Sequence, residues 1–156
     1  MSQFQPRPAS PPEPESQSGS RPAPIVQKPL RPLPEPVAGA VITVSDRCAA
    51  GQREDVSGPL AARLLAEHDV IVEAVRVVPD GAEPVRGAVR EAVAAGARVV
   101  LTTGGTGIMP RDLTPEGTAP LLAARMEGLE AQIRAHGLTK PPLAGLSRGL
   151  VGVTGR

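Results

Sequence analysis

A run of glycine, threonine and charged residues at 102–116 carries the strongest chemical signal in the sequence. It reads Thr-Thr-Gly-Gly-Thr-Gly-Ile-Met-Pro-Arg-Asp-Leu-Thr-Pro-Glu. Glycines allow the backbone to approach a ligand closely, and the exposed N–H groups of such a loop suit phosphate oxygens. The hydroxyls of Thr103 and Thr106 can add hydrogen bonds to the same ligand. Arg111 can neutralise phosphate charge, and Asp112 can hold a divalent cation.

This loop departs from the two common phosphate-binding signatures. No Gly-Lys-Ser/Thr follows it, which excludes a Walker A motif, and Gly104-Gly-Thr-Gly107 lacks the third spaced glycine of the dinucleotide fingerprint. A tight turn followed by a helix capped at Thr114-Pro115 fits the shape of the loop equally well. The loop alone therefore leaves a phosphate site and a structural turn open.

Two further aspartates follow apolar runs. Asp80 lies in Val-Val-Pro-Asp-Gly, and Asp46 lies in Ser-Asp-Arg. Alone, Asp80 is more typical of a turn than of a binding site. Together with Asp112 it forms the pair of carboxylates that Mg²⁺-assisted phosphoryl or nucleotidyl transfer needs, because Mg²⁺ binds a few carboxylates and the oxygens of its substrate. We expect Asp46 to order the loop that follows it, or to reach the ligand.

The elements that must position these residues are visible in the pattern of apolar residues. Runs rich in β-branched residues predict buried strands at 38–45, 70–78 and 98–103. Amphipathic helices are predicted between them, one over 57–68, capped by its first residue, and one over 84–96. The alternation predicts an α/β fold whose mostly parallel sheet has helices on both faces. Ligands of such sheets bind at the carboxyl ends of the strands, where the segments described above fall.

The beginning of the chain differs in composition from the rest. Residues 1–36 hold 11 of the 19 prolines. Such a segment buries too little apolar surface to offset its ordering entropy, so we expect a disordered tail followed by one domain at 37–156. Pro29-x-x-Pro32 is a weak match to the ligands of SH3-like grooves. The formal net charge of +1 gives no electrostatic reason to expect nucleic-acid binding.

Composition also limits the cellular compartment that we expect and the kinds of disulfide and metal site that the chain can form. No run of eighteen or more apolar residues predicts a membrane span, and Met1–Ser10 lacks the pattern of a signal peptide, so we expect a cytoplasmic protein. The single Cys48 excludes an internal disulfide and a multi-cysteine metal site. His68 and His136 look like ordinary residues at helix ends.

Taken together, these motifs resemble those of the MogA/MoaB family of molybdenum-cofactor biosynthesis proteins, whose domain also occurs in gephyrin-type proteins. The resemblance covers nearly all of residues 38–156, with the motifs in the family's order. The matching segments are Val44-Ser-Asp-Arg47, 51–58 with Asp55 and Ser57, Val78-Pro-Asp80, Leu101-Thr-Thr-Gly-Gly-Thr-Gly107, Arg111-Asp112, Thr114-Pro-Glu116 and Leu146-Ser-Arg-Gly149.

The resemblance implies a fold, a reaction and partners. The fold is a three-layer α/β/α sandwich, assembled as a homotrimer or, in some members, a hexamer. The domain binds molybdopterin and adenylylates its terminal phosphate with Mg²⁺ and ATP, and a MoeA-type partner then inserts molybdate. Asp80 and Asp112 match the family's catalytic aspartates. The implied substrate-binding residues are Asp46, Thr103, Gly104, Gly105, Thr106, Gly107, Arg111 and Ser147.

Two other functions stay open. One is a non-catalytic molybdopterin-binding or scaffolding module. The other is a nucleotide hydrolase of the CinA type, although Arg111-Asp112 after the glycine loop fits the molybdenum branch better. The resemblance also implies a strand and a helix beyond Arg156. We therefore expect a C-terminally incomplete domain whose parallel sheet stops at 151–153.

Overall fold

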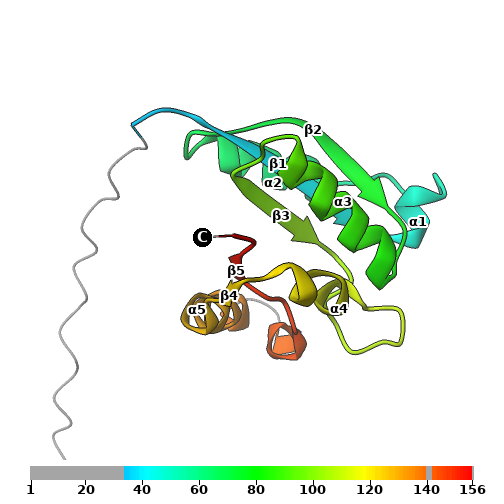
Figure 1. Cartoon of the computed structure of the whole chain (residues 1–156). Coiled ribbons are helices and arrows are strands. Elements are labelled where there is room, and N and C mark those ends of the chain that lie inside the picture. The colour runs from blue at the N-terminus through cyan, green and yellow to red at the C-terminus, as the bar shows by residue number, and fades with distance from the viewer. Residues whose placement is uncertain (1–33, 140–141, 156) are drawn as a thin grey trace, which may run out of the picture. The chain divides into compact units, whose positions relative to one another are not determined.

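The computed structural model describes residues 34–139 and 142–155, and its main sheet contains three parallel strands. The strands are β1 (Val37–Val44), β2 (Val70–Val78) and β3 (Val99–Thr103), in the order β2-β1-β3 (Figure 1). All three were predicted from their apolar runs, and the parallel pairing confirms the predicted fold class. The prediction of a disordered tail over residues 1–36 falls almost wholly outside the described residues.

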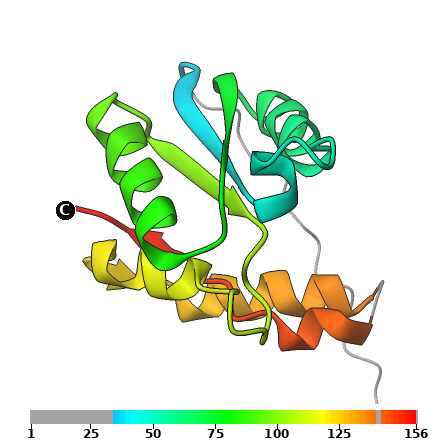
Figure 2. The same cartoon turned by 90° about the vertical axis from the view of Figure 1, so that its right-hand side faces the viewer.

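Helices cover both faces of this sheet. α2 (Ser57–Ala66) packs on β1 and β2 from one side, and α3 (Ala82–Ala94) packs from the other, so that Figure 2 shows three layers. The short helix α1 (Asp46–Ala49) follows β1 directly. The predicted three-layer α/β/α arrangement is therefore confirmed.

The core lies between β1 and α3. Ile42 and Val44 of the central strand are buried against Val85, Ala88 and Val89 of α3. The three α3 residues are spaced i, i+3 and i+4, as the amphipathic pattern predicts. Full burial of an aliphatic side chain of this size stabilises the fold by about 1.5–3 kcal/mol. This packing fixes the strand ends from which the loops of the site begin.

The cap of α2 and the start of α3 differ from the predicted ones. Ser57 does not cap α2 but is its first residue, and Asp55 Oδ1 instead accepts from the Gly58 amide at 3.0 Å. α3 begins at Ala82, before the predicted residue 84, because Gly81 adopts φ = 134° and turns the chain directly out of the strand end. In both places the turn is made by a residue that apolar periodicity does not reveal.

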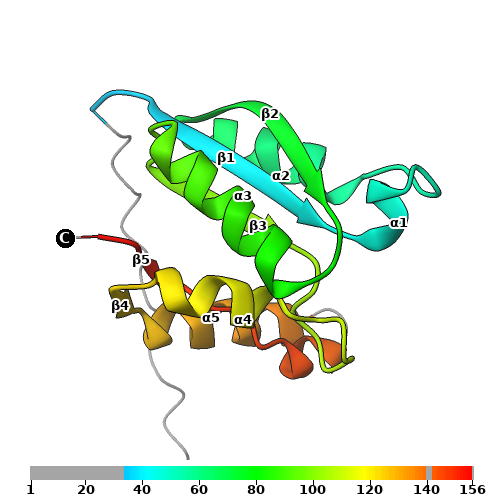
Figure 3. The same ribbon diagram turned by 45° about the vertical axis from the view of Figure 1, so that its right-hand side comes forward.

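The chain after β3 forms a region that lies beside that strand (Figure 3). The elements are α4 (Thr114–Thr118), the 3₁₀ helix η1 (Ala119–Leu121), β4 (Ala124–Arg125), α5 (Glu127–Leu138), the 3₁₀ helix η2 (Pro142–Leu146) and β5 (Gly152–Val153). The prediction that residues 151–153 extend the parallel sheet is wrong, because β5 pairs antiparallel with β4 in a sheet of its own. Gly152 makes this possible, since a side chain there would collide with the carbonyl oxygen of Ala124.

No helix within residues 34–139 and 142–155 is long and apolar enough to span a membrane.

Candidate functional site

The carboxyl ends of β1 and β2 bring two of the predicted aspartates together. Val44 and Val78 are paired in the sheet, so the residues that follow them emerge side by side. The Asp46 amide donates to Asp80 Oδ2 at 3.1 Å, and the Asp80 amide donates to Asp46 Oδ1 at 3.0 Å. This reciprocal pair shows that Asp46 does order its loop, and that it does so by contacting Asp80.

The glycine loop leaves β3 at the same edge of the sheet. Gly104 has φ = 94° and Gly105 has φ = 60°, both in the left-handed region that favours glycine. A side chain at Gly104 would collide with the carbonyl oxygen of Val44, so the loop lies against the end of β1. The buried Thr114 secures it, because its amide donates to the Gly105 carbonyl at 3.0 Å and its hydroxyl to the Gly104 carbonyl at 2.9 Å.

This geometry leaves backbone donors free. In the part of the chain that the structure describes, the N–H groups of Gly105, Thr106 and Gly107 donate to no protein acceptor. Successive free amides in a loop of this kind form a concave site for anions, including phosphate. The turn and the phosphate site are therefore compatible interpretations of the same loop.

Arg111 and Asp112 follow the glycine loop and close its far end. Arg111 Nη1 lies 3.3 Å from Asp46 Oδ2, which joins this segment to the aspartate pair. Asp112 Oδ2 accepts from the Met109 amide at 2.8 Å and would lie 2.6 Å from a side chain added at Gly107. The structure thus links all three predicted segments at one edge, Asp46 to Asp80 directly and the third segment through Arg111.

Asp80 and Asp112 each keep a carboxylate oxygen available for a magnesium ion bound largely through its substrate. Among the described residues, Oδ1 of Asp80 and Oδ1 of Asp112 have no hydrogen-bond partner, so each can bind a cation. The described ranges contain no cluster of three or more His, Cys, Asp or Glu side chains able to form a complete metal cage. Mg²⁺ characteristically takes one or two carboxylates and completes its coordination with water and phosphate oxygens.

Ser147 approaches the glycine loop from the other end of the chain. Its hydroxyl lies 3.4 Å from the Thr106 hydroxyl, and it accepts from the Gly149 amide at 3.3 Å. Thr103, Gly104, Thr106 and Ser147 line part of a cavity of about 970 Å³ beside β3. The structure therefore brings the Thr106 and Ser147 hydroxyls together, and Thr103 lines the same cavity.

Arg148 has no predicted role from the sequence beyond its place in the Leu146-Ser-Arg-Gly149 motif. Its amide donates to the Thr106 carbonyl at 2.8 Å, and its guanidinium donates to the carbonyl oxygens of Gly107 and Asp112. It also pairs with Glu116, and this hydrogen bond lowers the pKa of the Glu116 carboxyl. Arg148 joins Thr106 and Gly107 of the glycine loop to the Asp112 and Glu116 segment that follows it, and no local pattern reveals these partners because they lie more than 30 residues away.

Asp55 joins the loop after α1 to the sheet. Its carboxylate accepts from the Thr43 hydroxyl at 2.7 Å, the Gly58 amide at 3.0 Å and the Ser57 hydroxyl at 3.1 Å. Burial acts to raise the pKa of Asp55, but these hydrogen bonds together outweigh it and lower the pKa. Asp55 is therefore an ionised helix cap that holds the start of α2 against β1.

The part of the chain that contains these motifs is similar to known proteins. Residues 40–155 match a family model described as "Probable molybdopterin binding domain". The "Molybdenum cofactor biosynthesis bifunctional protein" of Synechococcus elongatus is 40% identical over 112 residues, which are 72% of this chain and 35% of that protein. The "Molybdopterin adenylyltransferase" of Pyrococcus furiosus is 45% identical over 98 residues, which are 62% of this chain and 56% of that protein.

A solved structure extends the agreement to three dimensions. The crystal structure of the "tungsten cofactor synthesizing protein MoaB" from Pyrococcus furiosus has 38% identity and a TM-score of 0.71, covering 80% of this chain and 77% of that one. The chain spans only 35% of the length of the Synechococcus relative. The domain match nevertheless includes the aspartate pair, the glycine loop and the Ser147 segment. The chain therefore belongs to the family of molybdopterin-binding domains represented by MogA and MoaB.

Proposed function

We propose that this domain binds molybdopterin and adenylylates its terminal phosphate with ATP and Mg²⁺. The observation that carries the proposal is the meeting of Asp80, the Arg111-Asp112 segment and the glycine loop at one sheet edge. Relatives from Pyrococcus furiosus and Haemophilus influenzae named molybdopterin adenylyltransferase support it. In this reaction an oxygen of the molybdopterin phosphate forms a bond to the α-phosphorus of ATP, and the bond from that phosphorus to pyrophosphate breaks.

The residues divide into two groups by the ligand they serve. Asp80 and Asp112 would hold Mg²⁺, and the ion would supply positive charge against the ATP phosphates and the pyrophosphate leaving group. The free amides of residues 105–107 bind phosphate oxygens, and the largely exposed Arg111 neutralises further charge.

The second group serves molybdopterin. Thr103, Thr106 and Ser147 present hydroxyl groups near the cavity, where hydrogen bonds to a pterin can form. Asp46 belongs with the first group, because it keeps Asp80 in place through their reciprocal hydrogen bonds.

The proposal includes an assembly, a partner and a compartment. We place the domain in a cytoplasmic homotrimer or hexamer that delivers adenylylated molybdopterin to a MoeA-type molybdate-insertion protein. The chemistry of the product supports a partner of that class. Adenylylated molybdopterin is an activated intermediate, so a second reaction must remove the adenylyl group and insert the metal.

The test is an incubation of the chain with molybdopterin, ATP and Mg²⁺, followed by the masses of the products. We expect adenylylated molybdopterin and one pyrophosphate per turnover, both lost in Asp80→Asn and both retained in Asp69→Asn. Asp69 is the matched control because it precedes β2, at the opposite end of the strand from Asp80. Tight binding of molybdopterin without any product would instead support the non-catalytic binding module.

A further inference from the structure

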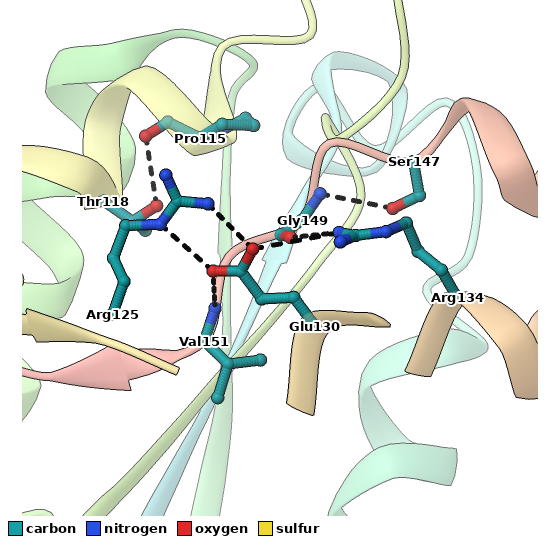
Figure 4. Close-up of polar contacts among 8 residues, drawn as sticks. All are labelled: Pro115, Thr118, Arg125, Glu130, Arg134, Ser147, Gly149 and Val151. Carbon is teal, nitrogen blue, oxygen red and sulfur yellow. Dashed lines mark hydrogen bonds and ion pairs between the residues drawn. The ribbon is translucent and has the colours of Figure 1, made fainter. Parts of the chain in front are cut away.

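Glu130 is a charged residue buried beside the candidate site. It lies on α5, and its side chain is only 2% exposed. A buried carboxylate is costly unless it is paired and hydrogen-bonded. Figure 4 shows two arginines approaching Glu130 from opposite sides, Arg125 from β4 and Arg134 from the next turn of α5.

The carboxylate of Glu130 is satisfied on both oxygens. Arg125 donates to Oε1 at 3.2 Å and to Oε2 at 2.8 Å, and Arg134 lies 3.9 Å from Oε2. The Val151 amide donates to Oε1 at 3.1 Å. The hydrogen bonds from Arg125 and Val151 lower the pKa of Glu130, so it is charged at neutral pH.

A short chain of hydrogen bonds connects the Glu130 contacts to the glycine loop. Arg134 also donates to the Gly149 carbonyl at 3.4 Å, and the Gly149 amide donates to Ser147 Oγ. Ser147 in turn lies against the Thr106 hydroxyl of the glycine loop. Residues 147–151 form neither helix nor strand, so side-chain contacts must supply much of what holds them.

We propose that Glu130 is a positioning residue for the pterin substrate. It acts through Arg134 and the Val151 amide, which fix residues 147–151 and so hold the Ser147 hydroxyl beside Thr106. This inference rests on the proposed function and deepens it, because it makes the binding of molybdopterin, but not of ATP, depend on the buried carboxylate of Glu130. The aspartates at the carboxyl ends of β1 and β2 are held by separate contacts and do not depend on Glu130.

The expected signature is a change in KM for one substrate only. Glu130→Gln keeps the volume of the side chain but removes its charge, which weakens both arginine contacts. We expect the KM for molybdopterin to rise about tenfold, because small displacements of positioning groups have large effects. The kcat and the KM for ATP should change less than about twofold, since binding is lost equally in ground and transition states.

Two further variants separate positioning from general damage. Glu91→Gln removes the same charge from an exposed ion pair with Arg76, away from the site, and should leave both KM values unchanged. In a Ser147→Ala background, Glu130→Gln should add little to the KM for molybdopterin, because both changes act on the same contact. Fully additive effects of the two changes would overturn the proposal.

Arg134→Gln decides the proposal if Glu130→Gln does not fold, and hydrogen exchange in a folded Glu130→Gln decides it if the wild type proves inactive. Arg134→Gln keeps the Glu130–Arg125 pair and should still raise the Kd for molybdopterin. A binding titration measures this Kd and does not require turnover. Hydrogen exchange of the Val151 amide should be faster in Glu130→Gln than in Glu91→Gln. Inactivity of the wild type would contradict the adenylyltransferase function only, whereas an unchanged molybdopterin Kd in Arg134→Gln would overturn the role of Glu130.

Discussion

At the scale of single residues, Asp112 is expected to act on chemistry rather than on binding of the pterin. Asp112→Asn keeps the acceptor for the Met109 amide but removes the negative charge that we propose binds Mg²⁺. We predict a fall in kcat of about 10²-fold, equivalent to about 2.7 kcal/mol of transition-state stabilisation, with little change in the Kd for molybdopterin. Steady-state kinetics and a binding titration check this, and wild-type turnover in Asp112→Asn would remove this carboxylate from the mechanism.

The glycine loop allows a matched pair of glycine substitutions. Gly104→Ala places a methyl group against the Val44 carbonyl at a positive φ, so we predict a loss of about 2 kcal/mol or more of unfolding free energy. Gly87→Ala, within α3, meets no atom within 4 Å and should gain about 0.5–1 kcal/mol from helix propensity. Urea unfolding measures both, and equal stabilities would show that the loop moves freely away from β1.

At the scale of elements, the start of α2 depends on Asp55 and not on Ser57. Removing an N-cap acceptor costs about 0.5–2 kcal/mol, so Asp55→Ala should lower the unfolding free energy by an amount in that range. Ser57→Ala should stay within about 0.5 kcal/mol of wild type, because the Ser57 hydroxyl makes one exposed contact. The opposite ranking in thermal or urea unfolding would restore Ser57 as the cap.

The elements that were predictable are those with a clear pattern of apolar residues. The three strands are continuous runs rich in β-branched residues, and α3 has apolar residues at the spacing of an amphipathic helix. The two-residue strands β4 and β5 are too short for any period, and their pairing depends on Gly152 fitting against Ala124. Apolar residues at 151–153 consequently suggested the wrong sheet.

The site was predictable to the extent that its residues follow strands directly. Asp46 and Asp80 follow neighbouring strands, so parallel topology alone places them together. Arg148 and Glu130 could not be assigned this way, because their partners are distant in sequence and lie in segments without a repeating pattern. Long-range side-chain contacts of this kind require the folded chain.

At the scale of the whole molecule, stability should depend on pH through its depressed carboxyl pKa values. The pKa of Glu130 lies below its ordinary value of 4.5, with Arg125 and Arg134 as the charges that face it. A depressed pKa contributes stability that is present above the unfolded-state value and is lost as pH falls through the folded-state value. The difference in Tm between wild type and Glu130→Gln should therefore be largest near neutral pH and shrink below about pH 4.5. A difference that stays constant with pH would show that the charge of Glu130 is not what stabilises the fold.

The central claim is that the domain transfers the adenylyl group of ATP to molybdopterin. It is tested most directly with ATP labelled at the α-phosphorus in one reaction and at the γ-phosphorus in another, each with molybdopterin and Mg²⁺. The account predicts that the α label appears in the pterin product and the γ label in pyrophosphate, in equal amounts. Release of the γ label as orthophosphate, or an α label that never reaches the pterin, would contradict it and favour a nucleotide hydrolase.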